Sequence, residues 1–238
     1  VRRQRQMCIR DRDNSIHFGH RTLDGKEIYY LTNQTNQTQV IAPEFRITNM
    51  LPELWLPTTG ERRVLPDFDI RGQVTAVPMM LEPYESVFVV FRTPSDTPIS
   101  TSISTNYPKL SLLTNVNSPW KVNFNASQRG PKEQVEFSEL LDWTNSDNEL
   151  IKYYSGTAYY SNKFTLQSLS KDKKILIDLG NFTAMAKVKV NGKYAGGLWT
   201  PPYQLDISDL VIPGENELEI EIVNTWVNRI IGDMQLPE

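Results

Sequence analysis

The segment 186–226 constrains the fold of this chain more strongly than any other part of the sequence. Apolar and polar residues alternate over 186–190 (AKVKV), and this period of two is typical of a strand with one buried face. Asn191 and Gly192 come next, and both tolerate the positive φ that a two-residue hairpin turn requires. The alternation returns over 217–222 (ELEIEI). The segment therefore predicts antiparallel strands joined by tight turns.

Short strands of the same kind recur upstream, whereas helical patterns are scarce. Ile175, Ile177 and Leu179 alternate along another short run. The strongest helical stretch, 137–143, covers at most about two turns. We therefore predict an all-β chain whose units are antiparallel β-sandwiches or jelly rolls.

The composition limits the number of domains and the classes of partner. A chain of 238 residues with 39% hydrophobic residues can bury one large β core or two smaller ones. The net charge of −3, without a basic patch among aromatic residues, gives no reason to expect nucleic acid as a partner. No run approaches the roughly eighteen apolar residues that suggest a membrane span, so no membrane partner is expected.

Residues 1–12 (VRRQRQMCIRDR) carry five arginines and one aspartate, in contrast to the acidic remainder. The peptide MCIRDR resembles the product of translating a sequencing adapter, so we interpret the segment as a disordered translation artefact that replaces the native N-terminus. The alternative is a basic arm that binds anions. Cys8, the only cysteine of the chain, lies in this segment, so no disulfide, thiolate nucleophile or cysteine metal site is predicted for the protein itself.

The remaining residues are expected to form two units. The first covers 13–95, and its predicted strands are 28–31, 40–45, 74–81 and 87–91. A stretch rich in Ser, Thr and Pro, 96–118, is predicted to be a linker or a crossing segment. The second unit covers 119–238, and its further predicted strands are 120–124 and 158–166.

Several motifs resemble known families of glycoside hydrolases. The stretch GTAYYSNKFTL and the run from ILIDLG to EIVNTW are similar to the galactose-binding-like jelly roll of family 2 glycoside hydrolases. DWTNSDNELIKYYSGTAYY and NTWVNRIIGDMQLP look like the C-terminal region of family 106, the bacterial α-L-rhamnosidases. GHRTLDGKEIYYLTN, PELWLPTTGE and VPMMLEPYESVFVVFR resemble the β domain that follows the catalytic barrel in family 106. The resemblance spans nearly all of 13–238.

This resemblance implies a role in the degradation of a plant or bacterial polysaccharide. The catalytic domain of family 106 is a (β/α)₈ barrel that precedes these segments, and eight strand–helix units do not fit in this chain. Glycoside hydrolysis needs two carboxyl groups about 5–10 Å apart. No acidic residue here matches the family's catalytic motifs, so no catalytic residue is assigned. We expect a non-catalytic C-terminal accessory fragment, periplasmic or extracellular, whose partners are the missing barrel of the same polypeptide and carbohydrate.

Two other classes of protein stay open at this point. One is a stand-alone carbohydrate-binding protein, which exposed coplanar aromatic residues would favour. The other is a purely structural β domain of another glycosidase, such as a β-galactosidase or β-glucuronidase, because the jelly roll is shared. Such a domain would carry a large apolar patch on the first unit, where a barrel packs. Only the resemblance implies that the parent protein is an enzyme.

Trp199 and Tyr203 are candidate sugar-binding residues. They flank the stretch Thr200-Pro201-Pro202, and Trp199 follows a glycine pair. A rigid turn of this kind can present an indole on a loop, where the C–H face of a sugar stacks on the aromatic ring. Alternatively, Trp199 covers an open end of the sandwich core.

The tail NTWVNRIIGD contributes five more candidates, namely Asn224, Trp226, Asn228, Arg229 and Asp233. Asn and Arg side chains offer donors to the hydroxyl and carboxylate groups of sugars. Alternatively, Arg229 and Asp233 form a structural ion pair that docks the C-terminus on the missing barrel.

His20 and Arg21 are the last candidates, at the start of the first unit. One interpretation is that they line the rim of the active site in the intact protein. The alternative is that they form a pair at the end of a strand and donate hydrogen bonds to backbone carbonyls. No His, Asp or Glu cluster has the spacing of a metal site, so no cofactor is predicted. A structural Ca²⁺ held by loop oxygens is left open, since spacing does not reveal such a site.

Overall fold

The computed structural model describes residues 15–95, 106–107, 109–117, 119–170 and 172–236. The segment interpreted as an artefact, 1–12, and the first part of the predicted linker, 96–105, lie outside the described residues. The chain forms two compact units, and the boundary between them along the chain lies between Leu110 and Ser111. Each unit is built from antiparallel sheets, which confirms the predicted all-β fold class.

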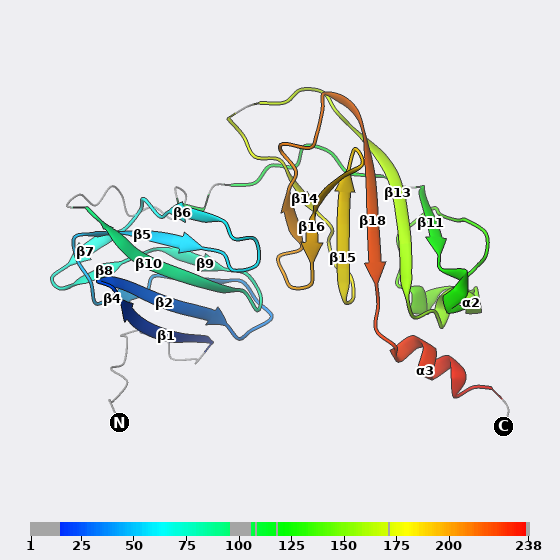
Figure 1. Ribbon diagram of the computed structural model, residues 1–238, viewed down its shortest axis with the longest axis horizontal. Coiled ribbons are helices and arrows are strands. Elements are labelled where there is room, and N and C mark those ends of the chain that lie inside the picture. Colours follow the sequence, from blue (N-terminus) through cyan, green and yellow to red (C-terminus); the bar gives the residue numbers. More distant parts are fainter. Residues whose placement is uncertain (1–14, 96–105, 108, 118, 171, 237–238) are drawn as a thin grey trace. The chain divides into compact units, whose positions relative to one another are not determined.

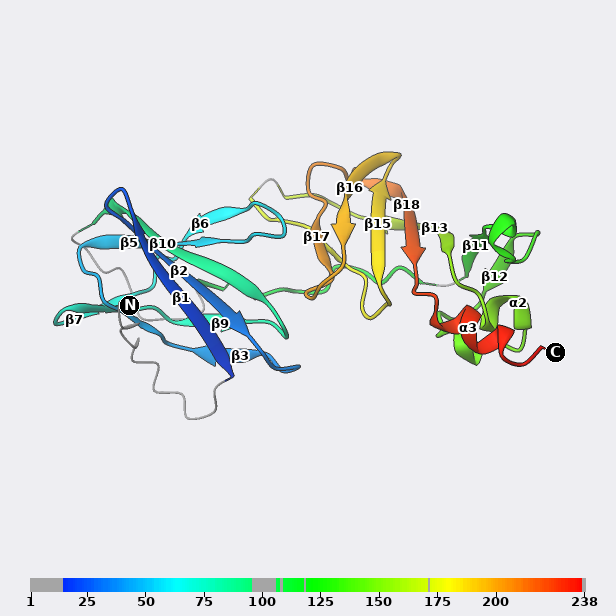
Figure 2. The same ribbon diagram turned by 60° about the horizontal axis from the view of Figure 1, so that its bottom comes forward.

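Unit 1 contains three antiparallel sheets (Figures 1 and 2). The largest has the strand order β1-β2-β10-β5-β6, so β10, the last strand of the unit, lies between β2 and β5. The two smaller sheets have the orders β3-β9 and β4-β8-β7. The strands are β1 (Ile16–Leu23), β2 (Lys26–Asn33), β3 (Gln39–Ile41), β4 (Glu44–Phe45), β5 (Met50–Trp55), β6 (Arg62–Val64), β7 (Asp69–Arg71), β8 (Val74–Ala76), β9 (Met79–Leu81) and β10 (Ser86–Pro94).

Two of the strands predicted for unit 1 are each divided in the structure. The predicted strand 40–45 forms β3 and β4, and the predicted strand 74–81 forms β8 and β9. Pro43 and Pro78 lie in the two interruptions. Proline has no N–H group to donate to a neighbouring strand, so it ends a ladder at these points.

Glu53 on β5 is a largely buried carboxylate in an ion pair with Arg92, and 9% of its side chain is exposed. Its Oε2 accepts hydrogen bonds from Trp55 Nε1 at 3.0 Å and from Arg92 Nε at 2.9 Å. Burial alone would raise the pKa of Glu53, but these hydrogen bonds and the positive charge of Arg92 together lower it. The folded state therefore favours the ionised carboxylate.

We expect Glu53→Gln to lower the free energy of unfolding by about 2 kcal/mol at pH 7, because it removes charge-assisted hydrogen bonds. A pKa below that of the unfolded chain stabilises the fold above the ordinary glutamate pKa, and this contribution is lost as the pH falls through the folded-state value. The difference between wild type and variant in urea unfolding should therefore shrink as the pH falls below the ordinary glutamate pKa of about 4.3. Glu219→Gln, at an exposed carboxylate, is the control. A difference that does not change with pH would contradict the assignment.

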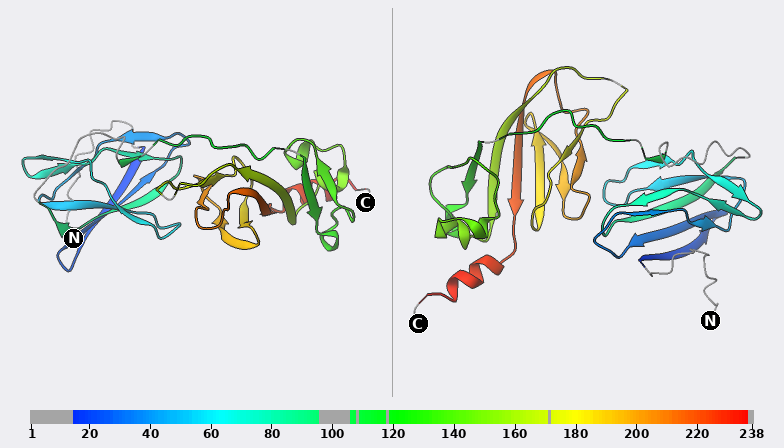
Figure 3. Two further views of the ribbon diagram at one scale, coloured as in Figure 1. Left: turned by 90° about the horizontal axis from the view of Figure 1, so that it is seen from above. Right: turned by 180° about the vertical axis from the view of Figure 1, so that it is seen from behind.

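Unit 2 contains a six-stranded sheet of order β12-β11-β13-β18-β15-β16 and a two-stranded sheet, β14-β17. Its strands are β11 (Trp120–Phe124), β12 (Val135–Phe137), β13 (Thr157–Leu166), β14 (Leu176–Asp178), β15 (Met185–Val190), β16 (Lys193–Leu198), β17 (Gln204–Asp206) and β18 (Gly214–Val223). Its helices are the 3₁₀ turns η1 (Ala126–Gln128) and η2 (Trp143–Asn145) and the α-helices α2 (Glu149–Lys152) and α3 (Val227–Asp233). Figures 1 and 3 show α3 beyond the end of β18, outside the sheet.

The hairpin and the alternating strands predicted for 186–222 are present in unit 2. Asn191 and Gly192 have φ values of +51° and +73° and join β15 to β16. Leu218 and Ile220 of β18 are buried. The alternating glutamates face lysines across the strands, with Glu217 opposite Lys163 of β13, and Glu219 and Glu221 opposite Lys189 and Lys187 of β15. The helical stretch considered at 137–143 is absent, because Phe137 ends β12 and Trp143 begins η2.

A β-bulge interrupts the pairing of β15 with the edge strand β16. Val188 pairs with Gly196 and Lys189 with Tyr194, so Ala195 is an extra residue on β16. Gly196 has a φ of +158°, and a Cβ atom there would lie 2.7 Å from Cδ2 of Leu205 on β17. The bulge and the glycine together let the second sheet approach the edge of the first.

The core of unit 2 is rich in aromatic residues where β11, β12, η2 and α2 meet. Trp143 Nε1 donates a hydrogen bond of 2.7 Å to the hydroxyl of Tyr160, and both residues are buried. Burial raises the pKa of Tyr160 to about 12, so the phenol stays neutral. Tyr154 is also fully buried, and its ring meets Phe124 edge to face at a centroid distance of 5.0 Å. This cluster supports the surface that carries the candidate site.

Candidate functional site

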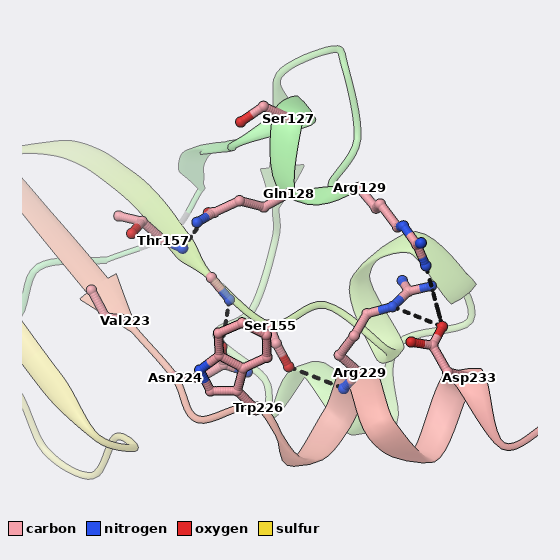
Figure 4. Close-up of a pocket in the computed structure, with 11 residues that line it drawn as sticks. Ser127, Gln128, Arg129, Ser155, Thr157, Val223, Asn224, Trp226, Arg229 and Asp233 are labelled. Carbon is pink, nitrogen blue, oxygen red and sulfur yellow. Dashed lines mark hydrogen bonds and ion pairs between the residues drawn. The ribbon is translucent and has the colours of Figure 1, made fainter.

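A pocket of about 420 Å³ lies in unit 2 where β13 begins and β18 ends. Thr157 and Val223 are paired across these two strands, so the loops next to them meet at one place. Figure 4 shows that side chains from η1, from the start of β13 and from α3 surround the pocket. The pocket thus joins segments that are far apart in the sequence.

The Tyr154 hydroxyl lies next to two residues that line the pocket, Gln128 and Thr157. It accepts a hydrogen bond from the Asn125 backbone N–H at 3.1 Å and donates to the Thr157 carbonyl at 2.7 Å. Oε1 of Gln128 lies 3.1 Å from the same hydroxyl and accepts a hydrogen bond of 3.1 Å from the Thr157 N–H. Burial raises the pKa of Tyr154, so the hydroxyl keeps its proton at neutral pH.

Asn224 connects the end of β18 to the start of β13. Its Oδ1 accepts a hydrogen bond of 2.9 Å from the Gly156 N–H, and its Nδ2 donates one of 2.9 Å to the Tyr154 carbonyl. Both ends of the amide are therefore bound to the backbone. Asn224 fixes the wall of the pocket as well as lining it.

A group of two arginines and one aspartate, with Arg129 and Asp233 exposed and Arg229 half-buried, forms one side of the pocket (Figure 4). Asp233 Oδ1 accepts hydrogen bonds from Arg229 Nε at 3.0 Å, from Arg229 Nη2 at 2.7 Å and from Arg129 Nη1 at 3.2 Å. The hydrogen bond from Arg229 is the main cause of the lowered pKa of Asp233. The carboxylate is therefore ionised at neutral pH, and the group carries a net charge of about +1.

Trp226 contributes an aromatic surface beside these charges. It precedes the first residue of α3, lines the pocket and is 79% exposed. An accessible indole next to guanidinium and amide groups offers both a stacking surface and hydrogen-bond donors. This combination suits a ligand with an apolar face and oxygen acceptors, such as a sugar.

Of the five candidates in the tail, the structure places four in this pocket, namely Asn224, Trp226, Arg229 and Asp233. Asn228 is half-buried on α3 and does not line it. The sequence did not suggest Gln128, Arg129 or Ser155 as members of the site. They come from distant parts of the chain, and the pairing of β11 with β13 and of β13 with β18 brings them to the tail.

Trp199 and Tyr203 lie elsewhere in unit 2. Trp199 follows β16 and is 55% exposed. Tyr203 precedes β17, and its ring packs on Phe182 with a centroid distance of 4.3 Å. Neither residue lines the pocket.

His20 and Arg21 lie on β1 of unit 1, and both are exposed. The His20 ring stacks on Tyr29 with a centroid distance of 4.2 Å, and its Nε2 contacts a carboxylate oxygen of Glu27. His20 therefore has side-chain partners within its own hairpin.

In the part of the chain that the structure describes, no three or more His, Cys, Asp or Glu side chains come together as a metal-ligand set. Among the same residues, no helix has the length and apolar character needed to cross a bilayer.

Comparisons with known proteins show that this chain is similar to glycoside hydrolases. The family model of glycoside hydrolase family 106, described as alpha-L-rhamnosidase, matches residues 2–69. The solved structure of a rhamnosidase from Novosphingobium sp. PP1Y is similar over 94% of this chain, with 35% sequence identity and a TM-score of 0.84. A protein of Formosa agariphila, provisionally named a β-glucuronidase, is 42% identical over 120 residues, or 50% of this chain.

These matches confirm the resemblance to the α-L-rhamnosidases of family 106, and the structural match extends it over nearly the whole chain. The chain is thus similar to a region of rhamnosidase-type and glucuronidase-type glycoside hydrolases. It spans only 22% of the Novosphingobium rhamnosidase and 10% of the Formosa protein.

Proposed function

We propose that this chain is a non-catalytic accessory part of an α-L-rhamnosidase-type glycoside hydrolase that acts on plant or bacterial polysaccharide. The observation that carries the proposal is the structural match to the Novosphingobium rhamnosidase, which covers 94% of this chain but 22% of that enzyme. In this proposal the main partner is the catalytic barrel of the same polypeptide. The polypeptide would act in the periplasm or outside the cell, where polysaccharides are met.

The chemistry of the pocket supports a non-catalytic role. Asp233 is the one carboxylate among its lining residues, whereas glycoside hydrolysis uses two carboxyl groups about 5–10 Å apart. A general acid also needs a raised pKa, and the pKa of Asp233 is lowered by its arginine partners. The pocket is therefore suited to holding a ligand rather than to cleaving it.

The same pocket supports carbohydrate as a second partner. Trp226 supplies the stacking surface, and the guanidinium groups of Arg129 and Arg229 supply donors and a net positive charge. A sugar that bears a carboxylate, such as a uronic acid, would match this charge better than a neutral sugar. The function of the pocket in this proposal is to hold part of the polysaccharide near the catalytic domain.

The accessory role can be tested by exchanging segments. In the Novosphingobium rhamnosidase, the region similar to this chain is replaced by residues 13–238, and hydrolysis of a chromogenic α-L-rhamnoside is measured. We expect the chimera to hydrolyse the substrate and the isolated chain to be inactive. The enzyme with the region deleted is the control and should be less stable or less active. Hydrolysis by the isolated chain, or full stability and activity of the deleted enzyme, would contradict the proposal.

Sugar binding can be tested at Trp226. We expect Trp226→Ala to weaken the binding of oligogalacturonate by about fivefold in calorimetry, because an aromatic contact contributes about 1 kcal/mol. The thermal unfolding midpoint should change little, since the side chain is 79% exposed. Trp199→Ala replaces an exposed indole outside the pocket and is the matched control. Equal losses in the two variants would argue against this pocket as the binding site. A stand-alone binding protein would be favoured by two results together. The isolated chain would bind the sugar with a submillimolar dissociation constant, and the chimera would not hydrolyse the rhamnoside.

A further inference from the structure

The apolar side chains of α3 are exposed and do not pack on the rest of unit 2. Val227, Ile230, Ile231 and Met234 recur with the spacing that places them on one side of a helix. They form a single stripe, with exposures from 47% for Ile231 to 80% for Met234. We call these four residues the α3 stripe. On an ordinary surface helix, such a stripe faces the core.

The opposite side of α3 is held by unit 2. The Arg229 N–H donates a hydrogen bond of 3.0 Å to Ser155 Oγ. Gly232 packs so closely that a Cβ atom there would lie 2.7 Å from Cβ of Tyr153. Just after the helix, Gln235 Oε1 accepts a hydrogen bond of 2.8 Å from the Tyr153 hydroxyl. These contacts fix the rotation of α3 about its axis, so the stripe cannot turn inward while they persist.

The ion pair predicted between Arg229 and Asp233 is present, but it has a local function. Arg129, next to η1, donates to the same carboxylate oxygen of Asp233. The charges therefore connect α3 to its own unit and leave the stripe as the outward surface. A helix of seven residues is marginal alone, so these contacts hold it in place with its apolar side exposed.

The size of the stripe indicates what covers it. A helix of seven residues is about 10 Å long, whereas a stable dimer buries about 800 Å² on each partner. The stripe is too small to hold a second copy by itself, but it fits as one contact within a larger interface between domains of one polypeptide. The similar rhamnosidase has most of its chain outside the matched region, since this chain spans 22% of it.

We propose that the α3 stripe is a docking surface for another domain of a rhamnosidase-type polypeptide. The partner surface is apolar and accepts the Ile230 and Met234 side chains. The proposal rests on the accessory role given above and assigns the contact to particular residues.

The test compares one pair of substitutions in two settings. Ile230→Gln with Met234→Gln is made first in the 238-residue chain and then in the Novosphingobium rhamnosidase whose matching tail is replaced by residues 226–236. In the isolated chain the thermal unfolding midpoint should stay within about 1 °C, because exposed substitutions have small effects. In the grafted enzyme it should fall by at least about 3 °C. Leu236→Gln is the matched control, at an exposed apolar residue beyond α3.

Every other result contradicts the docking surface. No change in either setting means that the stripe is uncovered, and an equal loss in both means that it belongs to the packing of unit 2. Self-association of the isolated chain that the substitutions abolish identifies a second copy as the occupant. If the graft of residues 226–236 without substitutions already destabilises the rhamnosidase, the α3 stripe does not fit the surface of that enzyme. Rhamnosidase activity of the full segment exchange is measured separately, so the accessory role can stand when the docking surface fails.

Discussion

Replacing Tyr154 by alanine is expected to lower the free energy of unfolding of unit 2 by about 4 kcal/mol, the usual cost of deleting a buried aromatic side chain. The ring is fully buried and packs edge to face on Phe124 and Trp143. The hydroxyl adds a second contribution, because it bonds to the Asn125 N–H and the Thr157 carbonyl. Both parts of the side chain therefore stabilise the floor of the pocket.

Urea unfolding followed by tryptophan fluorescence measures this effect. Tyr154→Phe separates the two contributions, and it should cost about 2 kcal/mol because it keeps the ring but leaves two part-buried backbone groups without this partner. Tyr159→Ala, at the exposed neighbour on β13, is the control and should change stability by about 0.5 kcal/mol or less. A loss below about 1 kcal/mol for Tyr154→Ala would show that the aromatic cluster does not support the fold.

Gly156→Ala is expected to be nearly as damaging, although it adds a single methyl group. A Cβ atom at this position would lie 2.3 Å from Oε1 of Gln128 and 2.8 Å from the hydroxyl of Tyr154. The backbone also has a φ of +153°, which residues with a side chain rarely adopt. We expect a loss of about 3 kcal/mol from strain and displaced hydrogen bonds. Under the proposed function, sugar binding should also weaken, because Gln128 must move.

Gly180→Ala distinguishes the clash from the backbone strain. Gly180 has a φ of +64°, but a Cβ atom there would meet nothing within 4 Å. This control should cost about 1 kcal/mol, which is the strain of the left-handed conformation alone. Similar losses for the two variants in urea unfolding would mean that the contact with Gln128 is not tight in solution.

The sequence predicted the fold where a local pattern decides the structure. The alternation along β18 and the Asn191-Gly192 pair are local, and the structure has the strand and the turn where they were predicted. In unit 1, the mostly apolar run 74–81 was predicted to be one strand, but Pro78 divides it between two sheets. The choice of partner strand depends on distant residues, which a local pattern does not contain.

The helix α3 was missed for a related reason. The four residues of the α3 stripe do have helical spacing, but the seven residues of α3 form too short a helix to be stable alone. The contacts that stabilise it come from Ser155 and Tyr153, more than seventy residues earlier in the chain. The polar and aromatic tail residues could be proposed as site residues, whereas Gln128 and Arg129 could not, because only the sheet register brings them to the pocket.

The bulge in β16 has a consequence for the behaviour of this chain in crowded solution. A straight outer strand offers a row of free N–H and C=O groups on which another chain can add a strand and start an aggregate. In unit 2 the bulge at Ala195 bends that row, and Leu205 packs against Gly196. At the other edge, β12 has only three residues. Both edge strands of the six-stranded sheet, β16 and β12, are thus poor templates for the addition of a strand from another chain. This limits aggregation by backbone pairing at the edges of that sheet.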